Sequence, residues 1–201
     1  MDFKEMGPVP YAWVGIAAVI TMILAVTICL LGDPSWDYNS GSMCDFGISD
    51  VKYVSVTFIG GCILSGLMFM VSGFGWFMFG ESKYVRTGAI VVVISGVALM
   101  CVGIFDKTYS FHQYVSIIYA IIFIIAIALV SVQDIKDRHF ILLIGLGILG
   151  LFGLATIFVD LCPYSMVQTI LMGYVFIWYV FKMLKIMDVQ NPIVRKIAGM
   201  D

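Results

Sequence analysis

A short polar stretch between two apolar runs holds the residues that could do chemistry. GIFDKTYSFHQ, residues 103–113, contains Asp106 and His112 six positions apart. Across a turn, a carboxylate can lie close enough to an imidazole to fix its tautomer and make it a better base, as a general base or proton carrier requires. We therefore treat these two residues as a candidate catalytic pair, in which His112 is the acid or base and Asp106 orients it.

The same stretch also has a purely structural explanation. Polar side chains such as Ser110 and Asp106 often cap helix ends, where they bind free backbone groups. A charge at the membrane surface also costs far less than one at the bilayer centre. A weakly similar turn, TIFVDLCPYSMVQ at 156–168, repeats the Ile-Phe, Asp, Tyr-Ser and Gln but has Val167 in place of the histidine. The histidine is therefore not needed to make such a turn.

A longer polar loop, 32–52, can fold over the same point. Two of its four acids, Asp45 and Asp50, join the candidate ligand-binding set, which becomes Asp45, Asp50, Asp106, Ser110 and His112. We expect no metal and no cofactor, because zinc needs three or four ligands and His139 is predicted on the other side of the membrane. A Ser–His–Asp hydrolase drawn from this set lacks a nucleophile-elbow sequence.

The cysteines divide by their expected depth. Cys29, Cys62 and Cys101 fall in apolar runs and are expected to pack as small hydrophobic residues. Cys44 and Cys162 fall in polar connections on one side. They can form a disulfide in an oxidising compartment, and a pair of free thiols is the alternative.

The composition indicates an all-α, polytopic membrane protein. Hydrophobic residues make up 62% of the 201 and charged residues 12%, with a mean hydropathy of +1.06, whereas soluble domains carry about 25% charged residues. A span needs about 20 apolar residues, and helices satisfy their own backbone in lipid. We predict one domain over 1–201, a six transmembrane helix bundle with spans at about 11–31, 53–79, 87–105, 112–133, 140–159 and 164–185.

The basic residues predict the orientation. Nine of the 11 Lys and Arg residues fall on one side of these spans, and only Lys52 and Lys107 fall on the other. The excess marks the cytoplasmic side, which places both termini in the cytoplasm and the 32–52 loop outside. The outer side is then acidic, and this makes nucleic acid an unsuitable partner. A loop this long either has a function or caps the bundle.

Three segments resemble the DUF998 family, small six-span membrane proteins of prokaryotes. SMCDFG at 42–47 is similar to a Ser-Asp-Leu-Gly element, with Cys44 where serine is usual and phenylalanine in place of leucine. VSVTFIGGCILSG at 54–66 resembles a Phe-Asn-Gly helix start, with Ile59 in place of the asparagine. VGIFDKTYSFHQ at 102–113 resembles a Val-Gly-Phe-acid turn followed by histidine. The resemblance implies the six-span fold and points to Asp45, Asp106 and His112, but it implies no activity.

Three functions stay open at this point. The first is binding or transport of a lipid or small amphiphile at an outer-leaflet polar site in the cell membrane. The second is an intramembrane enzyme that acts on a lipid headgroup with the His112 and Asp106 pair. The third is an accessory subunit with a membrane protein partner. The near absence of charge in the middle of the spans argues against an ion pump or pore, and membrane lipids are the expected partners.

Overall fold

The computed structural model describes residues 7–80, 82–136 and 164–190. Within these ranges the chain is helical and contains no strand. Five long helices and one short 3-10 helix follow one another as α1 (Val9–Gly32), η1 (Met43–Ile48), α2 (Lys52–Phe79), α3 (Lys83–Ile104), α4 (His112–Lys136) and α6 (Tyr164–Gln190).

The five long helices have the length and composition of membrane spans. Their most apolar windows have mean hydropathies from 1.6 to 3.0, and each helix overlaps one of the predicted spans. The chain is therefore a helical, multi-pass membrane protein, as the composition indicated. The other predicted span, 140–159, lies outside the described residues. The cytoplasmic location of both termini stays a prediction.

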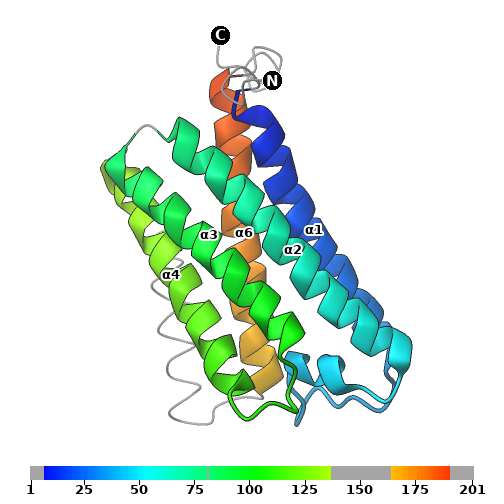
Figure 1. Ribbon diagram of the computed structural model, residues 1–201. Coiled ribbons are helices and arrows are strands. Elements are labelled where there is room, and N and C mark those ends of the chain that lie inside the picture. Colours follow the sequence, from blue (N-terminus) through cyan, green and yellow to red (C-terminus); the bar gives the residue numbers. More distant parts are fainter. Residues whose placement is uncertain (1–6, 81, 137–163, 191–201) are drawn as a thin grey trace.

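Helices α1 to α4 cross the bundle in alternating directions, and α6 runs in the same direction as α4 (Figure 1). Figure 1 shows the start of α1, the α2–α3 connection and the end of α6 at one end of the bundle. The opposite end, here called the loop end, holds η1, the α3–α4 connection and the start of α6 (Figure 1). Short connections force neighbouring helices to run antiparallel. The polar segments that sequence analysis singled out therefore gather at the loop end.

Small residues let α2 and α3 approach closely. A Cβ atom on Gly66 would lie 2.6 Å from the carbonyl oxygen of Gly96, and a Cβ atom on Gly96 would lie equally close to that of Gly66. Without a hydrophobic force between helices in lipid, such close backbone contact is a main source of helix association. The paired glycines set the spacing of this helix pair.

An aromatic cluster joins α6 to α2 and α4 inside the bundle. The ring of Phe69 in α2 lies 4.9 Å from that of Tyr179 in α6 and 5.7 Å from that of Phe123 in α4, centroid to centroid. The Tyr179 hydroxyl donates to Ser72 Oγ at 2.9 Å. The buried hydroxyl is thereby satisfied within the bundle, where no water is available.

Candidate functional site

The loop between α1 and α2 folds as a compact cap on the loop end. Ser42 begins η1 through a capping box: its hydroxyl accepts from the Cys44 backbone N at 3.3 Å, and its own backbone N donates to Asp45 Oδ2 at 2.6 Å. This reciprocal pairing satisfies free backbone donors at the start of a helix. The fully buried Phe46 stacks on Trp36 with a centroid distance of 4.9 Å. The cap thus has a hydrophobic centre of its own.

A buried carboxylate fixes the two ends of the cap. Asp33 accepts hydrogen bonds from the backbone and hydroxyl of Ser35 and from the hydroxyl of Ser49. These hydrogen bonds, first that from the Ser35 hydroxyl, hold the pKa of the Asp33 carboxyl below its ordinary value. The carboxylate form is therefore the one that ties the start of the loop to its end.

Hydrogen bonds join the cap to the first turns of α6. The Oε1 atom of Gln168 accepts from the backbone N of Met43 at 3.0 Å and from the Ser42 hydroxyl at 3.4 Å. The Ser165 hydroxyl donates to the carbonyl oxygen of Tyr38. Ser165 and Gln168 belong to the sequence repeat noted above, in which they correspond to the exposed Ser110 and Gln113. Matching residues of the repeat therefore differ in role: Ser165 and Gln168 bind the cap, whereas Ser110 and Gln113 lie exposed at the surface.

The predicted acids each have their own partners or lie exposed at the surface. Asp45 forms an ion pair with Lys107, so its two oxygens bind the lysine and the Ser42 backbone. Asp106 accepts from the backbone N of Thr108 at 2.9 Å and from its hydroxyl. These bonds, with the Thr108 hydroxyl as the larger cause, lower the pKa of the Asp106 carboxyl. Asp50 and Ser110 lie exposed at the surface.

His112 is buried, with 4% of its surface exposed, and its partners are not the expected ones. Its Nδ1 atom donates to the carbonyl oxygen of Phe105, because a carbonyl can only accept. Its Nε2 atom lies 3.3 Å from Ser116 Oγ, one helical turn along α4. Ser116 Oγ in turn lies 3.8 Å from Cys44 Sγ. The imidazole is therefore oriented by a backbone carbonyl, and Asp106 interacts with it only as a nearby charge.

Sequence reasoning missed Ser116 and Gln168 as members of this polar region. The four-residue spacing of His112 and Ser116 in a helix was the available signal, since such residues share a face. No local signal pointed from Gln168 to the cap. Cys44 is a free cysteine, and Cys162, its predicted disulfide partner, lies outside the described residues.

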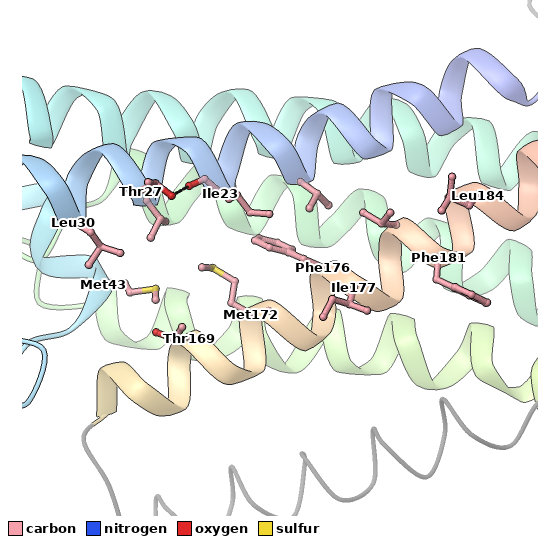
Figure 2. A pocket seen from close by; sticks show the side chains of 14 residues that line it. Ile23, Thr27, Leu30, Met43, Thr169, Met172, Phe176, Ile177, Phe181 and Leu184 are labelled. Carbon is pink, nitrogen blue, oxygen red and sulfur yellow. Dashed lines mark hydrogen bonds between the residues drawn. The ribbon is translucent and has the colours of Figure 1, made fainter.

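An apolar groove runs between α1 and α6, with a volume of about 610 Å³. Figure 2 shows Met172 and Phe176 of α6 facing Ile23 and Thr27 of α1 across it. Gly173 lines the groove, and a Cβ atom built on it would meet no other part of the described chain within 4 Å, so the groove is hollow at this point. The groove is lined by Val19, Ile23, Val26, Thr27, Leu30, Met43, Thr169, Met172, Gly173, Phe176, Ile177, Val180, Phe181 and Leu184.

The polarity of the groove is confined to its margins. The Thr27 hydroxyl donates to the carbonyl oxygen of Ile23 at 2.8 Å and is satisfied within its own helix. At the loop end, the Thr169 hydroxyl donates to the carbonyl oxygen of Ser165 and accepts from the Tyr38 hydroxyl at 3.4 Å. A molecule in the groove would therefore meet methyl and aromatic groups along its length and hydroxyl groups at one end.

Comparison with known proteins gives a family. The model of the family described as "Protein of unknown function (DUF998)" matches residues 16–184. The chain belongs to this family. The family predicted from the sequence is thereby confirmed. No curated protein and no solved structure matches the chain.

Proposed function

We propose that this DUF998 protein binds one hydrophobic chain of a membrane lipid or small amphiphile in the groove between α1 and α6. The carrying observation is the hollow at Gly173, where two apolar helix faces leave space that no side chain of the described residues fills. A groove of about 610 Å³ falls within the usual size range of small-molecule sites, roughly 300 to 1,000 Å³. Its lining of Met, Phe, Ile, Leu and Val suits an acyl chain.

The headgroup of such a molecule lies at the loop end in this proposal. Met43 and Thr169 line the groove there. The Tyr38 hydroxyl donates a hydrogen bond to the Thr169 hydroxyl, and Gln168 accepts one from the Met43 backbone N. A chain moving from lipid into the groove exchanges one apolar environment for another, so burial alone gives little preference. Selectivity must therefore come from the fit of the chain and from hydrogen bonds to the headgroup.

The predicted acidic residues enter this proposal unequally. Asp50 and Ser110 are exposed and free to meet a headgroup from the aqueous side, whereas the carboxylate of Asp45 is bound to Lys107. Within the described residues the loop end carries more acids than bases, which favours a neutral or cationic headgroup over an anionic one. As in the sequence analysis, we propose that the protein lies in the cell membrane, because its long apolar helices are suited to span a bilayer.

The test is native mass spectrometry of the protein released from mild detergent. Gly173→Phe fills the hollow and is expected to reduce the fraction of protein carrying one lipid at least about tenfold. Gly60→Phe is the matched control, because Gly60 also lies in a helix with open space at its Cβ position but outside the groove. Equal lipid retention by both variants would refute the proposal.

Two other functions are distinguishable in the same preparation. An accessory subunit would be released with a stable protein partner and without lipid. An intramembrane enzyme using the His112 and Asp106 pair would convert a lipid headgroup, and Asp106→Asn would abolish that conversion. The geometry favours the groove over this pair, because Asp106 is bonded to Thr108 and His112 to Phe105.

A further inference from the structure

Three polar side chains form a connected row beneath the cap. Cys44 of η1 lies with its Sγ atom 3.8 Å from Ser116 Oγ of α4, and Ser116 Oγ lies 3.3 Å from Nε2 of His112. Because Nδ1 donates to a carbonyl, Nε2 of the neutral ring carries the lone pair and can accept a proton. The row thus has a thiol at one end and a base at the other.

Cys44 differs from the other described cysteines in having both this base and some exposure. It is 9% exposed, whereas Cys29 and Cys62 are 0% exposed, and the Cys29 thiol donates to the carbonyl oxygen of Val54. Cys101 in α3 is more exposed than Cys44, but within the described part of the chain no hydrogen bond joins it to an imidazole. A thiol becomes a strong nucleophile when a neighbouring base takes its proton.

We propose that Cys44 is a nucleophilic thiol that accepts an acyl group from an activated ester or thioester, with His112 as the base and Ser116 as the proton relay. This proposal does not depend on the α1–α6 groove. Acyl donors of this class partition into membranes, so their concentration is high at the loop end of a membrane-spanning bundle. The thiol is a soft nucleophile, and the acyl carbonyl carbon is its ordinary target.

The proposed step balances as an acyl transfer. The Cys44 S–H proton moves to Ser116 Oγ while the Ser116 proton moves to Nε2 of His112. The sulfur forms a bond to the carbonyl carbon, and the bond from that carbon to the donor's oxygen or sulfur breaks. The imidazolium, held by the Phe105 carbonyl, returns its proton to the departing alcohol or thiol. The products are a thioester on Cys44 and a free alcohol or thiol, with no oxidation or reduction.

The test uses the full-length protein in detergent micelles with p-nitrophenyl octanoate as the acyl donor. Peptide mapping by mass spectrometry is expected to find the octanoyl group on Cys44, and neutral hydroxylamine is expected to remove it, as it does a thioester. Acylation of Cys101 in the same molecules is the internal reference for an accessible thiol without a base. The Cys44 rate is expected to exceed the Cys101 rate at least about tenfold.

Variants of His112 and Ser116 distinguish loss of the proposed base from loss of folding. His112→Gln keeps an N–H group for the Phe105 carbonyl but cannot take a proton, and it is expected to slow Cys44 acylation about a hundredfold. Ser116→Ala leaves the imidazole contact with Phe105 in place and is expected to give an intermediate rate, whereas Ser116→Thr keeps the hydroxyl and the rate. An unchanged thermal midpoint shows that the variants are folded.

Three results would overturn the proposal. The first is a Cys44 rate no greater than that of Cys101. The second is a His112→Gln variant that reacts at the wild-type rate. The third is a non-reducing peptide map that joins Cys44 to Cys162, because a thiol held in a disulfide cannot accept an acyl group.

Discussion

Replacing Gln168 with leucine removes a side-chain oxygen of α6 that accepts two hydrogen bonds from the cap. Gln168 Oε1 accepts from the backbone N of Met43 at 3.0 Å and from the hydroxyl of Ser42 at 3.4 Å. Both donors belong to buried residues, with Met43 6% and Ser42 8% exposed. Leucine has nearly the same size as glutamine, so the substitution tests the hydrogen bonds more than the packing.

The expected cost follows from the two bonds. A buried backbone N–H left without a partner costs about 1–3 kcal/mol, and the longer bond from the hydroxyl adds about 0.5 kcal/mol. We therefore expect the Gln168→Leu cap to open more easily by about 2 kcal/mol, which corresponds to roughly a thirtyfold larger opening equilibrium. The helical bundle is expected to keep its stability, because the two hydrogen bonds of Gln168 lie at the loop end and not between the membrane-spanning parts of the helices.

Hydrogen–deuterium exchange over residues 42–49 measures this opening. Amide exchange of Asp45, which donates to the Ser42 carbonyl oxygen at 2.9 Å, is expected to accelerate about thirtyfold in Gln168→Leu. Gln168→Glu keeps an acceptor oxygen in the same position and is expected to exchange at nearly the wild-type rate. If the leucine variant exchanges like the wild type, or the glutamate variant like the leucine one, Gln168 does not hold the cap.

Two further predictions concern helix packing and pH. Gly66→Leu forces a side chain against the α3 backbone and is expected to destabilise the bundle by about 1–3 kcal/mol. Gly60→Leu, the control, has open space at its Cβ position and is expected to change the thermal midpoint little. Equal thermal midpoints for the two variants would contradict this prediction. The hydrogen bonds of Ser35 and Ser49 lower the pKa of Asp33, so its contribution to stability is complete above the unfolded value of about 3.9 and disappears as the pH falls through the lower folded value. Thermal unfolding between about pH 5 and pH 2 should therefore show a larger loss for the wild type than for Asp33→Asn, and parallel curves would exclude this role.

Much of the fold could be predicted from the sequence because spans are a local property. A run of about 20 apolar residues must be a helix in lipid, since its backbone has no other partner there. This argument placed α1, α2, α3, α4 and α6 without knowledge of their neighbours. The close contact of Gly66 with α3 was not among the predictions. Its partner Gly96 could not be named, because the choice depends on how two helices register against each other.

The candidate site was harder to predict because its contacts are distant in sequence. The turn at 103–113 was correctly recognised as polar, but nearness in sequence made Asp106 the obvious partner of His112. Asp106 instead accepts a hydrogen bond from the backbone N of Thr108, two residues away, which is the local contact that an aspartate in a turn usually makes. The imidazole faces inward, toward Ser116 and the distant Cys44.

The sequence by itself determined that this chain is a helical membrane protein of the DUF998 family, with its polar connections gathered into a few short segments. Local composition and short motifs are sufficient for that. Only the tertiary structure decided which polar atoms meet: Cys44 with Ser116, Asp45 with Lys107, and Gln168 with the cap. It alone also revealed the groove at Gly173, because every apolar helix face looks alike in sequence, and a hollow exists only where two such faces fail to fill the space between them.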